Sequence, residues 1–335
     1  SRLSIWRRIT MRKPSDLSPE EVHSAVEAFK DGQSSRWLGG QLQVPHSSLR
    51  DMFARMGVTS GNRGGGVVVR EGKLILAGVD HQIPFQDDLV LALFEQYARD
   101  IQPDVIVLPG DVLDFWMLST KFKRRGADPQ ELVAEIARGE LHIRRLHEAA
   151  PNAKIVWIAG NHEERLYNYV IELAPALEPF TQGAGGLTLP HLLGLKDEKW
   201  FEYIGPYGEV YEYDSFLFKH GESTTQYAAK KELETEGSSG LSGHTHRSQS
   251  YFRTDRKGSH GWWSLPAMCN ITGAMKPPGY RKGASSVTNW QQGFGVVRFG
   301  PKKEEGTLFN VYPIIVSNGE FVSPEGVLYT RRSVL

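Results

Sequence analysis

Most of the chain alternates between two patterns of hydrophobic and polar residues. Short runs of apolar and β-branched residues, too short for helices, are separated by stretches with apolar residues at helical spacing. The clearest run is 105–108, which stops at Pro109-Gly110 and is followed by Asp111. Such a run is typical of a buried parallel strand, and open α/β sheets place their chemistry at the carboxyl ends of these strands. This stretch therefore predicts an acid at the functional edge of an α/β sheet.

The same alternation predicts the other elements of the larger part of the chain. The expected strands are 67–70, 73–80, 105–109, 154–159, 200–204, 210–213 and 216–219, followed by mainly β segments from Tyr251 onward. The expected helices are 88–100, 129–149, 164–173 and 225–236. Strands joined through helices of this length pair in parallel, so the pattern predicts an α/β fold.

The first 59 residues have a different pattern, typical of three short helices. The first begins at Ser18-Pro19, with Ser18 as the N-cap and Glu21 completing a capping box. The second is expected at about 34–42 and the third at 46–56. Together they resemble a helix-turn-helix, in which the third helix enters the major groove of DNA. The residues expected to contact bases or phosphates are His46, Ser47, Ser48 and Arg50. The alternative is a three-helix cap that serves packing or oligomerisation.

A glycine-rich segment at 60–68 is the expected linker between this module, residues 1–59, and a larger domain at 69–335. The whole chain has a formal net charge of zero, but residues 1–68 carry ten lysines and arginines against six acidic residues. This mild basic bias is consistent with DNA as a partner of the first module, although it is far weaker than that of a polycationic tail.

Composition limits the chemistry of any metal site and the compartment. The single cysteine, Cys269, excludes an internal disulfide and thiolate-rich metal sites, and it suits a reducing compartment. Any metal must therefore be bound by His, Asp, Asn or Gln. No apolar run approaches the roughly 18–20 residues of a membrane span, and the start lacks the apolar segment of a secretory signal. We expect a cytoplasmic protein with no membrane or disulfide-linked partner. The chain does not begin with Met, which leaves room for residues before Ser1.

Five loops after expected strands carry potential metal ligands. They are Asp80-His-Gln82, Gly110-Asp111, Gly160-Asn-His-Glu163, His220-Gly-Glu222 and Gly243-His-Thr-His246. Their order resembles the calcineurin-like metallophosphoesterase superfamily, whose pattern is DxH, GD, GNH[D/E], a lone His and GHxH. The resemblance covers about residues 73–300, and four such motifs in order are specific. It implies a two-sheet α/β/β/α sandwich with the ligands on loops at one edge, and hence a metallophosphoesterase domain at 69–335.

The resemblance also implies a site for two divalent metal ions. One ion would be bound by Asp80, Gln82, the shared Asp111 and His246, and the other by Asp111, Asn161, His220 and His244. Hard oxygen and imidazole ligands suit Mn, Fe, Zn or Mg, with Mn favoured. Two such ions clamp a phosphoryl group and activate water, so the implied mechanism is attack by a hydroxide that bridges them.

Two further residues receive roles from the same resemblance. His162 would donate a hydrogen bond or a proton to the leaving oxygen. Arg165, near Glu163, would either pair with a phosphate or support Asp111 or Asp114, and support is the favoured role. Asp114 is expected to support the ligands and not to bind metal.

The chain departs from the family pattern at the first motif, where Gln82 stands at the position of a histidine and His81 precedes it. An amide oxygen binds a hard metal, but it is a weaker donor than imidazole. We expect Gln82 to be the ligand. The alternatives are that His81 turns in instead, or that this metal site is poorly occupied and activity is low.

Several stretches indicate how a substrate would bind. The basic loop after the Asp111 strand, with Lys121, Lys123, Arg124 and Arg125, could follow a phosphate backbone, although a solvated charge run has the same pattern. Trp116 is a candidate for stacking on a base. The segments 262–270 and 289–297 resemble parts of phosphoesterases from tailed bacteriophages, and we expect them in the second sheet and at the rim of the site.

The sequence therefore predicts a two-metal phosphodiesterase or nuclease that acts on DNA, in a bacterial cell or a phage-infected host. A small-molecule phosphomonoesterase or a cyclic-nucleotide phosphodiesterase is the alternative within enzymes. A DNA-binding regulator with a degenerate metal site, suggested by Gln82, is the alternative outside enzymes.

Overall fold

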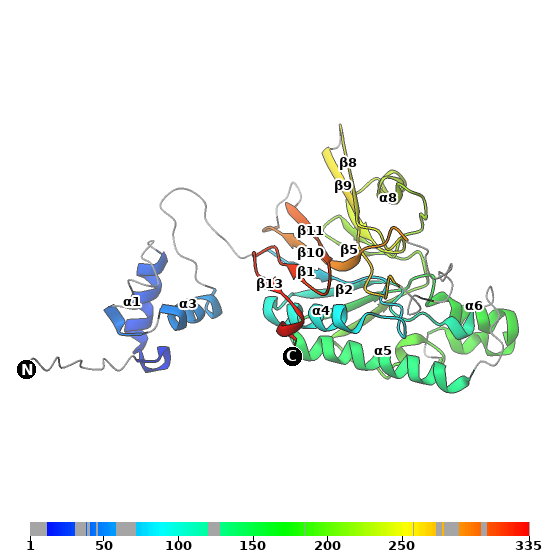
Figure 1. Ribbon diagram of the computed structural model, residues 1–335, viewed down its shortest axis with the longest axis horizontal. Helices are drawn as coiled ribbons and strands as arrows, with labels where there is room; N and C mark the ends of the chain where they lie inside the picture. The colour runs from blue at the N-terminus through cyan, green and yellow to red at the C-terminus, as the bar shows by residue number, and fades with distance from the viewer. Residues whose placement is uncertain are drawn as a thin grey trace, which may run out of the picture. The chain divides into compact units, whose positions relative to one another are not determined.

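A computed structural model describes residues 12–30, 38, 41–44, 46–57, 72–119, 128–183, 185–256, 258–272, 277, 288–302 and 307–334 (Figure 1). The chain divides into two compact units, Ser1–Glu71 and Gly72–Leu335. In the part of the chain that is described, no helix has the length and apolar character needed to cross a membrane.

The first unit contains short helices around a small apolar core. Its described elements are η1 (Pro14–Asp16), α1 (Pro19–Lys30) and α3 (His46–Arg55). The core is formed by buried residues such as Val26, Leu49 and Phe53, and the rings of Phe29 and Phe53 stack 4.3 Å apart. Most of the expected second helix at 34–42 lies outside the described residues, as do the side chains of His46, Ser47 and Arg50. The proposed base contacts of α3 therefore stay a prediction.

The capping box expected at the start of α1 is present. The backbone N–H of Glu21 donates to Ser18 Oγ (3.1 Å), and the backbone N–H of Ser18 donates to Glu21 Oε2 (2.8 Å). These two bonds satisfy N–H groups that have no partner within the helix.

We expect Ser18→Ala to destabilise α1 by about 1 kcal/mol, because one N–H loses its acceptor at the helix start. Hydrogen exchange of the α1 amides in the full chain should then be about fivefold faster. Ser24, exposed in the middle of the same helix, supplies the control, since Ser24→Ala removes no cap. Equal exchange rates in the Ser18 variant and the wild type would show that the cap does not stabilise α1.

The second unit alternates strands and helices and then becomes mainly β. Its helices are α4 (Asp88–Ile101), η2 (Trp116–Leu118), α5 (Pro129–Ala149), α6 (Glu164–Leu173), η3 (Pro175–Thr181), α7 (Leu189–Leu192), α8 (Ala228–Glu236) and η6 (Arg331–Ser333). Its strands are β1 (Leu74–Ala77), β2 (Val105–Pro109), β3 (Lys154–Ile158), β4 (Phe201–Ile204), β5 (Tyr211–Tyr213), β6 (Phe216–Phe218), β7 (Gly240–Ser242), β8 (Gln249–Asp255), β9 (Gly258–Ser264), β10 (Gln292–Phe299), β11 (Phe309–Val316), β12 (Phe321–Val322) and β13 (Leu328–Tyr329). The expected strand at 67–70 lies outside the described residues.

The first sheet has six strands in the order β11-β10-β1-β2-β3-β4. Strands β1 to β4 are parallel, with Ile75 opposite Val105 and Val105 opposite Lys154. Their carboxyl ends therefore lie at one edge, which carries the loops after β1, β2 and β3. Strands β10 and β11 add in antiparallel fashion beside β1.

The second sheet has five strands in the order β5-β6-β7-β9-β8, with β6, β7 and β9 parallel. The two sheets face each other across a buried apolar layer that includes Val107 and Val156 from the first sheet and Phe216 and Leu241 from the second. Helices α4 and α5 pack on the outer face of the first sheet, and α8 packs against Trp262 of the second (Figure 1). The architecture is the expected α/β/β/α sandwich.

One expectation about the sheets is wrong. The segment 289–297 does not belong to the second sheet, because β10 pairs with β1 in the first. Its apolar residues alternate between the two faces of that sheet: Phe294 packs in the helix-side core and Val297 in the layer between the sheets. The segment 262–270 does begin in the second sheet, since Trp262 is part of β9.

Candidate metal centre

The expected metal ligands follow strand ends, and five of the seven share an unusual backbone conformation. Asp80 follows β1, Asp111 follows β2, and His244 and His246 follow β7. Their φ angles are 52°, 53°, 69° and 57°, and that of Gln82 is 50°. Residues other than glycine rarely adopt this left-handed conformation, at a cost of about 1–3 kcal/mol each. Such strain persists where surrounding structure imposes it, and its concentration at one edge indicates a functional site.

Four ligand atoms converge on one point near His220. His220 Nε2 lies 3.1 Å from His244 Nδ1, 3.1 Å from Asn161 Oδ1 and 3.3 Å from Asp111 Oδ2. The ligand atoms of Asp111, His220 and His244 all lie within 4.8 Å of one another. The other ring nitrogen of His220, Nδ1, donates to the carbonyl oxygen of Pro109 (2.9 Å). This bond directs the Nε2 lone pair toward the cluster, as is usual for a metal-binding histidine.

The charges in this cluster reflect the same convergence. Burial alone would raise the pKa of Asp111, but the facing imidazoles of His162 and His220 hold it well below its usual range. Burial lowers the pKa of His220, yet the carboxylate of Asp111 outweighs it and raises the pKa to about 9. Burial and the charge of His220 lower the pKa of His244 to about 4. Asp111, His220 and His244 thus interact strongly around one point, the kind of position that a cation takes.

A second group of ligand atoms lies beside the first. His246 Nε2 is 3.4 Å from Asp80 Oδ1 and 3.1 Å from Gln82 Nε2. Asp80 Oδ1 and Gln82 Oε1 are buried without a hydrogen-bond partner among the described residues. Asp80 Oδ2 accepts a hydrogen bond from the backbone N–H of His244 (2.8 Å), which joins the two groups. A half-turn of the Gln82 amide would place its oxygen next to His246.

The side chain of His81 points away from these ligands. It is fully buried, and its ring lies 5.1 Å from that of His142 and 6.3 Å from that of Phe94. His81 therefore packs in the core between the sheet and its helices, whereas Gln82 faces His246. Of the two alternatives at the departure from the family motif, this geometry supports Gln82.

We expect Gln82→His to tighten divalent metal binding at this second group about tenfold, because imidazole is a better donor than an amide oxygen. Titration of the metal-free protein with Mn²⁺ measures the effect. Gln130→His, at an exposed position of α5, controls for adventitious binding by an added histidine. Unchanged affinity of the Gln82 variant would reject position 82 as a ligand.

Glu163 holds the Asp111 loop in place. Its carboxylate accepts hydrogen bonds from the backbone N–H groups of Asp111 (2.9 Å), Leu113 (3.0 Å) and Gly160 (2.7 Å). Burial and the nearby Asp111 charge raise its pKa to about 7. The loops pass so closely that a Cβ at Gly160 would collide with Asp111 Oδ1. The sequence showed Glu163 only as the last letter of a motif, while its contacts make it the link between two ligand loops.

His162 and Arg165 form a small network with Asp114. Arg165 donates to the carbonyl oxygen (2.6 Å) and Oδ1 (3.0 Å) of Asp114 and to His162 Nε2 (2.9 Å). Asp114 Oδ2 lies 3.2 Å from His162 Nδ1, an electrostatic contact whose angles fall outside those of a hydrogen bond. The backbone N–H of His162 donates to Asp111 Oδ1 (2.9 Å). Arg165 thus has the geometry of a supporting residue, consistent with the favoured expectation.

Two aromatic residues at the site had not been singled out as site residues. The ring of Tyr207, in the segment after β4, lies 5.9 Å from that of His220, and its hydroxyl donates to the carbonyl oxygen of Gly221. The ring of Trp290 lies 4.2 Å from that of His246. Tyr207 gave no local signal, because the contact depends on the path of a long connection. Trp290 fell within a segment expected at the rim.

The expected substrate contacts are placed only in part. Lys121, Lys123, Arg124 and Arg125 lie outside the described residues. Trp116 is the first residue of η2 and is partly buried. Base stacking and phosphate contact by these residues stay predictions.

The donor set fits divalent cations. Carboxylate oxygens, an asparagine amide and imidazole nitrogens suit hard or intermediate metals. The convergence of lone pairs on His220 Nε2, and the buried oxygens of Asp80 and Gln82 without partners, are the environments that cations would satisfy. The assignment of particular ligands to each ion remains a prediction.

One family model and several known proteins are similar to this chain. A family model described as calcineurin-like phosphoesterase matches residues 80–297, well over half of the chain. The Gene 54 protein of Mycobacterium phage D29 is 28% identical over 239 residues, a match that covers 67% of this chain and 88% of the phage protein. The Gene 54 protein of Mycobacterium phage L5 is 28% identical over 246 residues, with the same shares covered. Vacuolar Protein Sorting 29 from Cryptosporidium parvum aligns with 77% of this chain and 96% of its own, at 11% identity and a TM-score of 0.39.

The family match spans all five ligand loops, from Asp80 to His246, and the structure brings those loops to one edge of the sandwich. The chain belongs to the calcineurin-like phosphoesterase family, whose members are metal-dependent hydrolases of phosphoric esters.

Proposed function

We propose that this protein is a two-metal phosphodiesterase that hydrolyses phosphodiester bonds in DNA. The observation that carries the hydrolase chemistry is the convergence of Asp111, Asn161 and His244 on His220 Nε2, with Asp80, Gln82 and His246 beside it. DNA as the substrate is supported by the helix-turn-helix resemblance of the first unit.

A small pocket next to the ligands has room for a phosphoryl group. It has a volume of about 240 Å³ and is lined by Leu118, Ser119, Asn161, Glu164, Arg165, Asn168 and Tyr207. Asn161 and Asn168 offer amide N–H donors, and Arg165 adds positive charge at its wall. Phosphoryl oxygens accept hydrogen bonds from such groups, which would orient the ester beside the ligands.

Asp111 and His162 would then have separate roles in the hydrolysis. Divalent cations bound at the site would neutralise charge on the phosphoryl oxygens and lower the pKa of a water nucleophile. Asp111 is held by Glu163 and by its contacts with His220 and His162, and it would hold the cations in position. His162, held between Asp114 and Arg165, would move a proton to the leaving oxygen.

The substrate class is tested by incubating the full-length protein with Mn²⁺ and three substrates. These are linear DNA, bis-p-nitrophenyl phosphate and p-nitrophenyl phosphate. We expect turnover of DNA and of the diester. Turnover of the monoester alone would reject the phosphodiesterase assignment. No turnover with Mn²⁺, Fe²⁺, Zn²⁺ or Mg²⁺ would favour a DNA-binding regulator.

The role of the first unit is tested by deleting residues 1–60. If its third helix contacts DNA, the deletion should weaken DNA binding and reduce the slope of log affinity against log salt, because fewer phosphates are neutralised. Turnover of bis-p-nitrophenyl phosphate serves as the control and should not change. Equal DNA affinity and salt slope in both proteins would show that the unit does not bind DNA.

A further inference from the structure

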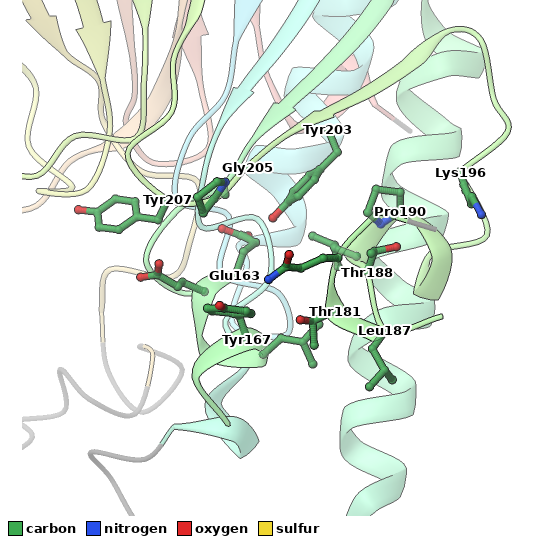
Figure 2. Close-up of a pocket in the computed structure, with 17 residues that line it drawn as sticks. Glu163, Tyr167, Thr181, Leu187, Thr188, Pro190, Lys196, Tyr203, Gly205 and Tyr207 are labelled. Carbon is green, nitrogen blue, oxygen red and sulfur yellow. The ribbon is translucent and has the colours of Figure 1, made fainter. Parts of the chain in front are cut away.

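A second, larger pocket opens beside the metal ligands and is not used by the chemistry above. It has a volume of about 710 Å³ and is bounded by α6, η3, α7 and the segment that follows β4 (Figure 2). Three tyrosines, Tyr167, Tyr203 and Tyr207, line it, so we name it the tyrosine pocket. Figure 2 shows Tyr203 and Tyr167 on opposite sides of Glu163, with Tyr207 at one end and Lys196 at the other. A cavity of this size holds a ligand as large as a nucleoside.

The tyrosine pocket is continuous with the metal centre through shared residues. Tyr207 and Glu164 line both this pocket and the small pocket that contains Asn161. The ring of Tyr207 is 5.9 Å from that of His220, and Glu163, in the pocket wall, accepts a hydrogen bond from Asp111. A group covalently attached to a phosphate at the ligands would therefore enter the tyrosine pocket.

Two of the polar groups that line this pocket, the side chains of Glu164 and Tyr203, are available to a ligand. The carboxylate of Glu163 already accepts hydrogen bonds from three backbone N–H groups. By contrast, the half-buried carboxylate of Glu164 has no hydrogen bond or ion pair with any residue that the structure describes. The same holds for the hydroxyl of Tyr203. Burial and the charges of Glu163 and Glu164 raise the pKa of Tyr203, so this hydroxyl stays protonated and can donate.

The charges of the tyrosine pocket argue against a phosphate inside it. Its described lining includes the acids Glu163 and Glu164 and a single cationic side chain, Lys196, which Figure 2 places far from Tyr207. A phosphate needs several cationic or N–H donors, whereas a flat uncharged ring stacks on tyrosine faces. The lining thus fits an aromatic ring with hydrogen-bonding edges.

We propose that the tyrosine pocket binds the purine base of the nucleotide attached to the scissile phosphate, with guanine as the best match. Guanine presents two adjacent N–H donors to a carboxylate such as that of Glu164, next to a carbonyl oxygen that accepts from a hydroxyl such as that of Tyr203. Adenine presents one donor group and no carbonyl oxygen on this edge. The assignment rests on the proposed function, since it identifies the substrate as a nucleotide ester.

The assignment has a consequence for the form of DNA that is cut. A base in a duplex must leave its stack and its partner to enter a pocket, which costs a few kcal/mol, whereas a base in a single strand is free to enter. The protein should therefore prefer single-stranded DNA or frayed ends to the interior of a duplex.

Binding of nucleosides to the full-length protein tests the pocket without any turnover. Equilibrium dialysis with deoxyguanosine, deoxyadenosine, deoxycytidine and thymidine should give the tightest binding for deoxyguanosine and the next tightest for deoxyadenosine. Tyr167→Ala should weaken deoxyguanosine binding about tenfold through lost stacking. Glu164→Gln should weaken deoxyguanosine about tenfold and deoxyadenosine less, since only guanine pairs two donors with the carboxylate.

Matched controls lie on the same helix. Tyr169→Ala and Glu172→Gln change exposed residues of α6 outside the pocket and should leave binding unchanged. Absence of deoxyguanosine binding to the wild type would overturn the assignment. So would deoxyguanosine binding to the Tyr167 and Glu164 variants that is as strong as binding to the wild type. Nucleosides carry no phosphate, so the two proposals can fail separately. Binding without phosphodiester turnover would reject the proposed function alone, and turnover without nucleoside binding would reject the pocket alone.

Discussion

An Asp111→Asn variant should lose turnover of every phosphoester by ~10³-fold or more. Metal ions contribute several kcal/mol of transition-state stabilisation, and each 1.36 kcal/mol corresponds to a tenfold change in rate. The Asp111 carboxylate faces His220 at 3.3 Å and His162 at 3.6 Å, so the amide would remove the negative charge at the middle of the ligand set. Loss of one charged ligand should also empty at least one metal position.

Metal content and turnover of bis-p-nitrophenyl phosphate, measured on the same preparation, check this result. Asp197→Asn, at an exposed position, is the control and should retain both. Thermal unfolding distinguishes a lost site from a lost fold. A folded Asp111→Asn protein that keeps two metal equivalents and turns over within tenfold of the wild type would contradict the shared-ligand assignment.

The second large effect is expected at His162. Because general acid catalysis contributes about 10²–10⁴-fold, His162→Gln should slow DNA cleavage by that factor while metal content stays unchanged. Its Nε2 accepts from Arg165 in this structure, so donation to a leaving oxygen requires the protonated ring and a break of that contact. Asp114 Oδ2, 3.2 Å from His162 Nδ1, places a carboxylate beside the ring and helps to hold its orientation.

The dependence on the leaving group separates acid catalysis from a structural role. A poor leaving group such as a deoxyribose oxygen needs the proton, whereas p-nitrophenolate does not. His162→Gln should therefore slow DNA cleavage much more than hydrolysis of bis-p-nitrophenyl phosphate. His191→Gln, at an exposed position, is the control. Equal losses for both substrates would show that His162 only positions its neighbours.

Much of the fold could be predicted from local pattern. Helix α5 and helix α6 have the expected ends, and β2 delivers Asp111 as expected. Residues that start or end an element mark their boundaries locally, such as Pro109-Gly110 at the end of β2 or Asp128-Pro129 at the start of α5. The segment at 289–297 was assigned to the wrong sheet because an apolar, β-rich run does not show which neighbour it will pair with.

The order of the ligand motifs along the chain was enough to determine the family and the set of metal-site candidates. This is so because each ligand motif follows its own strand, and parallel strands bring their carboxyl ends to one edge. Only the tertiary structure decided that Gln82 and not His81 faces His246, since the two residues of that contact are 164 positions apart. It also decided that Glu163 joins two ligand loops and that three tyrosines, from α6, from β4 and from the segment after β4, line one pocket. These features depend on contacts between remote segments, which no local pattern of hydrophobic and polar residues encodes.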